Sequence, residues 1–308
     1  MTTVTLDELM LRYVPDPPRP VAPALVEARG HFRAGLADLS QVKDSALPKE
    51  WMWRANAPSD IRSAFFRQYE ALEDTRARIG SLVAGTTGRQ APARPLAGST
   101  TEARWDLHGL LAPLADSDLD QPTGNEEWTV RQTLAHIVNG QRAYFWYTSW
   151  WLSRSDADDF PPRVPEDVAA EFPDEESDGV GSLDGIRQRL DDVVDLSAGT
   201  LGLLSDDQLA SRARFAGLPV DVRFRINRWS SHMREHTIQV EKTLGFINRT
   251  TTEVDRLLRM VAGAYGRLED AVFMLPDSPA VDDALRMIGD TCLGVARDAK
   301  SVRAASDH

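Results

Sequence analysis

Several features that this chain lacks narrow its function before any motif is considered. Cysteine occurs once, at Cys292, which excludes an intramolecular disulfide framework and a zinc ribbon built from thiolates. No apolar run approaches the roughly 20 residues that a membrane-spanning helix needs. Residues 1–20 also lack the basic stretch followed by an apolar run that marks a signal peptide. We therefore expect a soluble, cytoplasmic protein with no membrane partner.

Acidic residues outnumber basic ones, and the negative charge is distributed unevenly along the sequence. The net charge is −12, with 35 Lys and Arg against 47 Asp and Glu, which argues against a nucleic-acid partner because such proteins usually carry a basic surface. Residues 153–182, here called the acidic segment, hold ten acidic residues against Arg154 and Arg163, a net charge of −8. We expect a solvated insertion there; a lid over a pocket is the alternative.

Alternating strand patterns are also missing, whereas apolar residues recur at three- and four-residue steps along most of the chain. Hydrophobic residues make up 42% of the sequence, which is enough to build a core. The pattern predicts an all-α protein. The expected helices cover residues 24–40, 60–83, 101–115, 127–152, 183–205, 220–247, 251–274 and 279–303.

The chain divides by composition into three parts. A Gly-, Thr-, Pro- and Ala-rich stretch at 84–100 has the composition of a linker. The four helices after it, joined by short, long and medium connections, indicate a four-helix bundle. We therefore expect an N-terminal helical region at 1–98, a bundle at 99–248 and a C-terminal helix pair at 249–308. The terminal helices either form a second, degenerate bundle together or are unrelated flanking helices.

The segment HMREH, His232 to His236, is the first candidate functional motif. Two histidines four residues apart lie on one face of a helix, so both rings can reach a single ion. The same letters fit H-x-x-E-H, the inverted zinc-protease pattern in which Glu235 would activate water. That pattern needs a further acidic ligand well downstream and a large α+β frame. After Asp255 the acidic residues lie only in a short tail, and the sequence shows no such frame.

A catalytic metal usually takes three protein ligands, so the pair calls for a third. His31, His108 and His136 are the candidates, since His308 is the terminal residue. His136 lies on a helix that is apolar nearly all round and is therefore buried. Gly140 and Ala143, one and two turns further on, leave room for a pocket beside it. His136 is thus the preferred third ligand.

The spacing resembles a known family. The string W-T-V-R-x-x-L-A-H, which begins at Trp128 and ends at His136, is followed about a hundred residues later by H-x-x-x-H in a long helix. This combination is similar to the DinB/YfiT-like superfamily, a metal-binding four-helix bundle related to mycothiol- and bacillithiol-dependent transferases and to the metal-binding domain of a mycothiol-dependent isomerase. The resemblance covers residues 100–248. It implies a divalent ion, zinc or nickel, held by His136, His232 and His236.

The resemblance also suggests a function, a metal-dependent transferase that uses mycothiol or bacillithiol as nucleophile towards a small electrophile. Arg225 and Arg228 are candidates to bind a carboxylate or sugar-linked group of the thiol, with Tyr147 facing the substrate. Gln239 is a candidate to orient the ring of the first histidine of the pair, and Glu235 is a candidate base at the pocket rim. For each of these five residues the alternative is an ordinary exposed or core position without a role in the site.

Two other functions stay open. One is a hydrolase in which the ion activates water. The other is a non-catalytic, metal-stabilised binding protein, although structural zinc usually takes four protein ligands. The tryptophans are expected mostly in the core (Trp128, Trp146, Trp150, Trp151 and Trp229), and Cys292 is expected to be a buried hydrophobic residue and not a nucleophile. Monomer and homodimer are both compatible with the sequence.

Overall fold

The all-α fold expected from the sequence is confirmed. A computed structural model describes residues 5–54, 57–85, 90–124, 126–154, 156, 160–273, 275 and 278–307. The chain forms two compact units, each assembled from separate stretches of sequence. The first unit comprises Met1–Pro20, Ala91–Thr100 and Asp116–Ile247, and the second comprises Val21–Gln90, Thr101–Ala115 and Asn248–His308.

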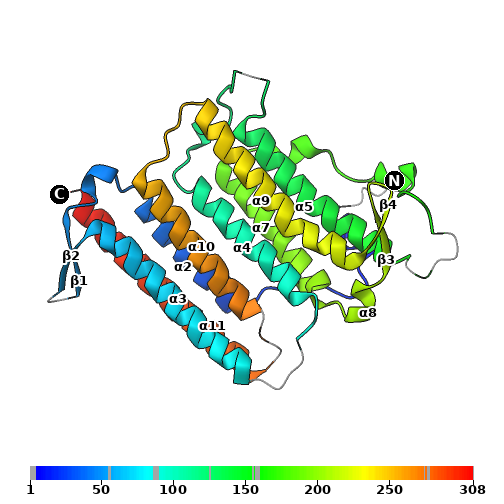
Figure 1. The fold of residues 1–308 in the computed structure, drawn as a ribbon, viewed down its shortest axis with the longest axis horizontal. Coiled ribbons are helices and arrows are strands. Elements are labelled where there is room, and N and C mark those ends of the chain that lie inside the picture. The colour runs from blue at the N-terminus through cyan, green and yellow to red at the C-terminus, as the bar shows by residue number, and fades with distance from the viewer. Residues whose placement is uncertain are drawn as a thin grey trace. The chain divides into compact units, whose positions relative to one another are not determined.

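Three long helices dominate the first unit, α5 (Val130–Leu152), α7 (Leu183–Thr200) and α9 (Val222–Phe246), and they lie side by side in Figure 1. Helices α5 and α9 pack along each other, and α5 also packs against α7. The shorter elements are α1 (Leu6–Leu11), α6 (Glu166–Ala169), α8 (Asp206–Leu209) and the 3-10 turns η2 (Asp116–Asp118), η3 (Glu175–Gly179) and η4 (Leu201–Leu203).

Polar caps determine where the three long helices begin. The Thr129 hydroxyl accepts a hydrogen bond from the backbone N–H of Gln132, whose side chain in turn accepts one from the Thr129 N–H, which forms a capping box. The Asp221 carboxylate and the Ser182 hydroxyl each accept one backbone N–H at the starts of α9 and α7, without the reciprocal bond of a capping box. These caps satisfy N–H groups that have no partner inside the helix. They place the helix starts within three residues of the positions predicted from the sequence.

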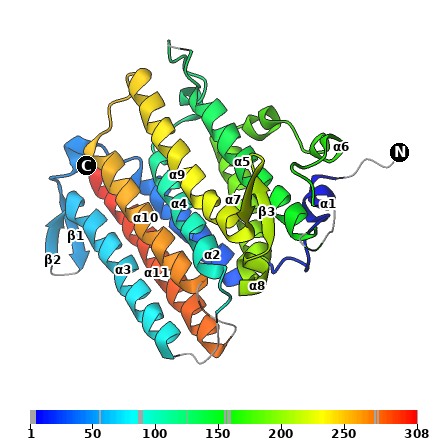
Figure 2. The ribbon, with the colours of Figure 1, turned by 45° about the vertical axis from the view of Figure 1, so that its right-hand side comes forward.

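A β-hairpin that the sequence pattern did not predict lies against α5 and α9 (Figure 2). Its strands are β3 (Arg212–Phe215) and β4 (Leu218–Asp221), paired antiparallel through a two-residue turn. Both turn residues have positive φ, +49° at Ala216 and +82° at Gly217. That geometry is typical of a type I′ turn. The strands are too short for alternation to be visible, so the turn was the only usable signal.

The acidic segment is attached to α5 over its second half, so it is more than a solvated insertion. The buried Asp178 carboxylate pairs with Arg142 (Nη1–Oδ1 2.5 Å) and accepts a hydrogen bond from the Asn139 amide. The Arg131 guanidinium donates to the backbone carbonyls of Gly179 and Gly181. These contacts hold η3 against the N-terminal half of α5.

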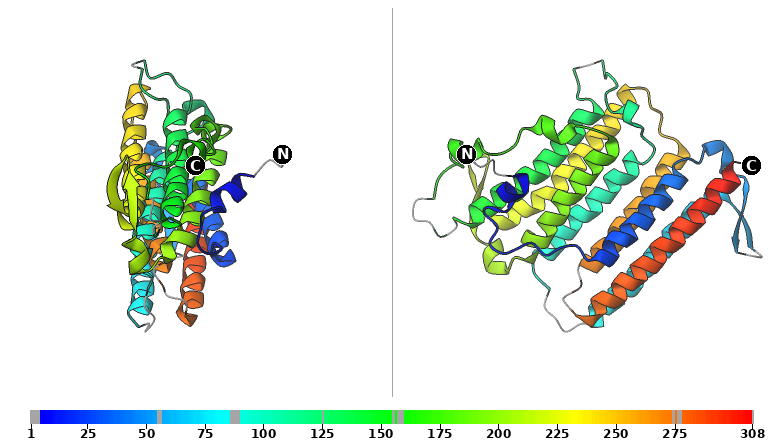
Figure 3. Two further views of the ribbon diagram at one scale, coloured as in Figure 1. Left: turned by 90° about the vertical axis from the view of Figure 1, so that its right-hand side faces the viewer. Right: turned by 180° about the vertical axis from the view of Figure 1, so that it is seen from behind.

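The N-terminal stretch also belongs to the first unit. Helix α1 packs on α5, as Figure 3 shows, with the Trp146 indole N–H donating to the Leu9 carbonyl. Further along, the Arg19 N–H donates to the Gly199 carbonyl. Gly199 lacks a side chain where one would meet the Arg19 carbonyl oxygen at 2.3 Å, so this close approach of two backbones requires glycine.

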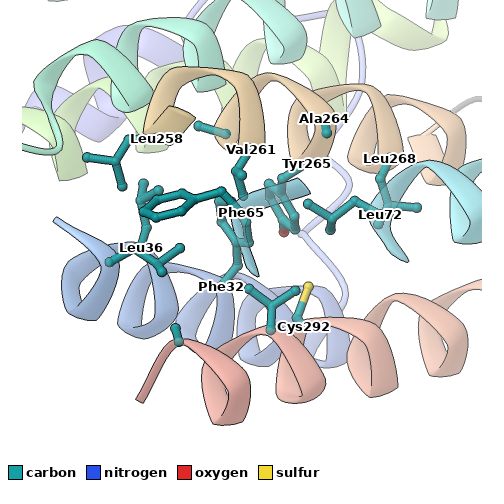
Figure 4. Close-up of a cluster of buried hydrophobic side chains, with 14 of the residues drawn as sticks. Phe32, Leu36, Phe65, Leu72, Leu258, Val261, Ala264, Tyr265, Leu268 and Cys292 are labelled. Atoms are coloured by element: carbon teal, nitrogen blue, oxygen red, sulfur yellow. The ribbon is translucent and has the colours of Figure 1, made fainter. Parts of the chain in front are cut away.

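Helices from both ends of the sequence form the second unit. These are α2 (Pro23–Leu39), α3 (Ile61–Gly85), α10 (Glu253–Phe273) and α11 (Pro279–Ser306), with a small hairpin of β1 (Glu50–Arg54) and β2 (Ala57–Asp60) and the 3-10 turn η1 (Asp44–Ala46). Phe32, Phe65 and Tyr265 meet in their shared core (Figure 4). Cys292 is buried there, and burial raises the pKa of its thiol, as expected of a core residue.

Helix α4 (Arg94–Leu111) begins seven residues before the predicted start at 101, inside the stretch that had the composition of a linker. Residues 101–111 fall in the second unit, where α4 packs closely on α10. A Cβ at Gly109 would lie 2.7 Å from that of Ala262, and one at Gly266 would lie 2.9 Å from that of Trp105. The units are therefore interleaved in sequence, and the expected domain boundaries at 98 and 248 stay a prediction. None of the described helices has the length and apolar content to cross a bilayer.

Candidate metal centre

Three histidines converge between α5 and α9. His136 comes from α5, and His232 and His236 come from successive turns of α9. One ring nitrogen of each lies within 4.8 Å of the others, and the Nε2 atoms of His136 and His232 are 3.3 Å apart. Within the described part of the chain, this is the one cluster of histidine, cysteine or carboxylate groups with the spacing of metal ligands.

The space for this cluster depends on a glycine. Gly140 lies one turn after His136 on α5, and a Cβ there would be 2.4 Å from Cε1 of His232 and 3.1 Å from its Nδ1. Carbon atoms in contact are normally about 3.5–4.0 Å apart. The ring of His232 can therefore lie between the two helices only because position 140 has no side chain.

Hydrogen bonds orient two of the rings. The Nδ1 atom of His136 is 2.9 Å from a carboxylate oxygen of Glu175, and that of His236 is 2.7 Å from the amide oxygen of Gln239. Both oxygens are acceptors, so each Nδ1 carries the proton and each Nε2 keeps its lone pair. Metal-ligating histidines usually donate their other N–H to a carboxylate or carbonyl in this way.

The third ring is held by burial. His232 is 7% exposed, and its Nδ1 atom is buried with no hydrogen-bond partner in the described structure. Burial, followed by the neighbouring His236 and His136, lowers the pKa of His232 to about 3, and burial also lowers the pKa of His236. Neutral imidazoles that turn lone pairs towards one another fit a cation between them. The donor set therefore suits a divalent ion such as zinc, with three protein ligands.

An indole forms the outer wall of the centre. The ring centroid of Trp128 lies 5.0 Å from that of His136 and 6.5 Å from that of His236, nearly parallel to the latter. Trp128 is 38% exposed. The expectation that the tryptophans lie mostly in the core agrees with the burial of Trp146, Trp150, Trp151 and Trp229. Trp128 is the exception, because it packs on the edge of the histidine cluster and its outer face meets solvent.

A cavity of about 660 Å³ opens beside His136 and His232. Its walls come from α5, the acidic segment, the β3–β4 hairpin and the start of α9. The lining residues fall into three groups: aromatic (Tyr144, Tyr147, Trp151, Phe215), cationic (Arg163, Arg214, Arg225) and small or aliphatic (Gly140, Ala143, Pro162, Val164, Ala169, Ala216, Gly217), with Asn139 beside the histidines. No Asp or Glu is among the described residues that line it.

The structure brings some of the predicted site residues to the cavity and leaves others outside it. Tyr147 and Arg225 line it. Arg228 does not; its guanidinium lies 3.4 Å from the Glu235 carboxylate, which is 61% exposed. Glu235 therefore points to solvent and gives no support to a role as base. The sequence had suggested that Gln239 orients the ring of His232. In the structure Gln239 contacts the ring of His236, because Gln239 lies one turn beyond His236 on α9.

Glu175 and Arg214 are the residues that sequence reasoning missed. Glu175 is one of ten acidic residues in the acidic segment, and no spacing rule distinguishes it from the others. Arg214 reaches the cavity through the β3–β4 hairpin, which the pattern did not predict. Only the tertiary fold identifies either residue.

One family model matches the chain. The DinB superfamily model covers residues 99–240, a segment that contains His136, His232 and His236 and nearly all of the cavity wall. The resemblance inferred from the Trp-Thr-Val-Arg motif is therefore confirmed. No curated protein and no solved structure gives a significant match.

Proposed function

Given that residues 99–240 are a DinB-superfamily segment, we propose that this protein is a metal-dependent thiol S-transferase. In this proposal His136, His232 and His236 hold one zinc or nickel ion. A low-molecular-weight thiol, mycothiol or bacillithiol, binds beside the triad, and a small electrophile occupies the cavity. The thiol RSH and the electrophile R′X give RSR′ and HX.

A divalent ion held by three neutral imidazoles supplies a cationic position that lowers the pKa of a thiol or water bound there. Glu175 and Gln239 keep the Nε2 lone pairs of two rings directed at that position. Burial keeps His232 unprotonated at neutral pH. The chain thus brings three imidazole donors from two helices to one position.

The composition of the cavity wall supports a small organic reactant beside the triad. The wall combines aromatic rings with three arginines, and the described residues that line it include no carboxylate. Glu235, the base suggested by the sequence, is directed to solvent and paired with Arg228. A metal-bound thiol and a metal-bound water would both lose a proton without that base, so hydrolysis is the second candidate and the experiments below separate the two. The histidine triad at the edge of a cationic, aromatic cavity is the observation that carries the proposal.

The first experiment is to load chelator-treated protein with zinc or nickel and measure its melting temperature with each thiol. We expect mycothiol or bacillithiol to raise the melting temperature of the metal-loaded protein and to leave that of the metal-free protein unchanged. The O-analogue of the same thiol, with hydroxyl in place of thiol, is the matched ligand control. Equal shifts with and without metal would refute a metal-bound thiol.

The second experiment measures the disappearance of free thiol with a model electrophile. His236→Ala should abolish the reaction, whereas His31→Ala, on an exposed face of the second unit, should leave it unchanged. Ester or amide hydrolysis by the loaded protein, with no thiol consumed, would replace this proposal with a hydrolase.

A further inference from the structure

Arg225 is a buried cation without a countercharge. It is 5% exposed, and no acidic side chain in the described chain forms an ion pair with it. Its Nε donates to the Thr148 hydroxyl at 3.0 Å, and its Nη1 donates to the Arg214 carbonyl at 2.6 Å. Both partners are neutral, and Nη2 has no hydrogen-bond partner in the described structure. Burial lowers the pKa of Arg225 only to about 10, so the charge persists at neutral pH.

A buried charge without an opposite charge is strongly unfavourable, and buried charges are normally paired or coordinate a metal. The buried cations of the second unit show the usual arrangement. Arg29 and Arg104 both contact the Glu269 carboxylate there, and all three side chains are nearly inaccessible to solvent. Arg225 differs because it lies in the wall of the cavity that also contains His136 and His232.

Two further arginines in the cavity wall add to this positive charge. Arg214 also lines the cavity, and its Nε is buried with no hydrogen-bond partner in the described structure. Arg163 lines it from the acidic segment, and neither guanidinium forms an ion pair with a described acidic residue. The wall is therefore cationic at the end that contains Arg225.

The distance between Arg225 and His232 determines how long a ligand must be to contact both. Arg225 and His232 are seven residues apart on α9, which is about 10 Å along the helix axis at 1.5 Å per residue. Aromatic rings lie in the same wall, those of Tyr144, Tyr147 and Phe215. A ligand that contacts both ends needs an anionic group, a body several bonds long, and apolar or aromatic surface between.

We propose that Arg225 forms a carboxylate-binding subsite, and that the cavity takes a monocarboxylate with an apolar or aromatic body whose far end reaches the histidine triad. One buried guanidinium with two donors already used suits a single negative charge better than a phosphate dianion. The placement of the far end rests on the proposed function. The carboxylate subsite itself rests on Arg225 and the cavity alone.

Calorimetric titration with 4-phenylbutanoate and its neutral amide tests the subsite. We expect the wild-type protein, metal-loaded, to bind the acid at least tenfold more tightly than the amide. Arg225→Gln should remove this preference. Arg228→Gln is the matched control, since it removes a guanidinium one turn away that lies outside the cavity wall, and it should keep the preference. Arg225→Lys retains the positive charge and should keep part of the preference for the acid. The melting temperature of this variant shows whether its fold is intact.

Binding of the carboxylate to the metal is the alternative explanation, so the titration is repeated after chelator treatment. Retention of the tenfold preference without metal is the expected result. Loss of the preference on metal removal, together with its persistence in Arg225→Gln, would overturn the proposal. So would equal binding of acid and amide by the wild-type protein.

KM values of the Arg225→Gln variant show whether the electrophile or the thiol carries the carboxylate. If the electrophile carries it, Arg225→Gln raises KM for an acidic electrophile and leaves KM for its amide unchanged. If the thiol carries it, the variant raises KM for the thiol and leaves KM for both the acidic electrophile and its amide unchanged. Should no thiol transfer occur at all, the proposed function fails while the titration still decides the fate of the subsite.

Discussion

Gly140→Ala is the substitution that tests the metal centre most directly. The added Cβ would lie 2.4 Å from Cε1 of His232, and an ordinary carbon contact is about 3.5–4.0 Å. The ring must therefore move by roughly 1 Å or more, whereas metal–ligand distances tolerate about 0.2 Å. We expect the affinity for zinc or nickel to fall at least ~100-fold, which corresponds to about 2.8 kcal/mol at 1.4 kcal/mol per factor of ten.

The same change should affect folding much less. Replacing glycine by alanine inside a helix stabilises it by about 1 kcal/mol, and overpacking a buried site costs about 1–3 kcal/mol. The two effects largely offset each other, so we expect the free energy of unfolding of the metal-free protein to fall by no more than about 2 kcal/mol. A folded protein that no longer binds metal is the predicted phenotype.

Competition with a chelator of known affinity measures the affinity for the metal. Gly80→Ala is the matched control. It also lies inside a helix, and a Cβ there would have no atom within 4 Å, so it should leave metal affinity unchanged. Wild-type affinity in Gly140→Ala would show that the metal is not held at the His136 cluster.

Three further predictions concern the triad, its orientation and the second unit. His136→Ala should abolish metal binding by elemental analysis of the purified protein, and His31→Ala should not; the opposite pattern would mean that the ligand set is wrong. Glu175→Gln should weaken metal binding about 10–100-fold in the same chelator competition, with Asp174→Asn on the same segment as the unaffected control. Burial raises the pKa of Asp270 from 3.8 to about 7, so the folded state holds this proton more tightly than the unfolded chain. The free energy of unfolding should therefore decrease as pH rises from about 4 to 7, and Asp270→Asn should flatten that decrease in urea titrations at pH 5 and 8; an unchanged slope would exclude Asp270 as its origin.

Periodicity in the sequence was sufficient to predict the helices and the ligand pair. Apolar residues at three- and four-residue steps placed the long helices to within a few residues at nearly every end, because burial of one face and local capping act over a single turn. The four-residue spacing of His232 and His236 likewise sets both rings on one face of α9, whatever the remainder of the chain does. His136 was selected by its small neighbours, and Gly140 does lie against the ring of His232.

The start of α4 and the β3–β4 hairpin were not predicted, for a different reason. Residues 94–100 have the composition of a linker, yet they are helical, because contacts made after folding outweigh weak local preferences. The hairpin strands are four residues each, too short for a two-residue period to stand out. These stretches acquire their structure only from what they pack against.

By itself, the sequence determined that the protein is all-α, that two histidines share one helix face, and that a segment resembling the DinB superfamily contains a third. Only the tertiary structure decided that Glu175 orients His136, that Gln239 contacts His236, and that Arg225 lies uncompensated in a cavity beside the triad. The physical reason is the separation along the sequence over which each kind of interaction acts. Helix formation and ligand spacing act within one or two turns, whereas hydrogen-bond partners and cavity walls come from segments tens of residues apart, whose meeting depends on the packing of the whole unit.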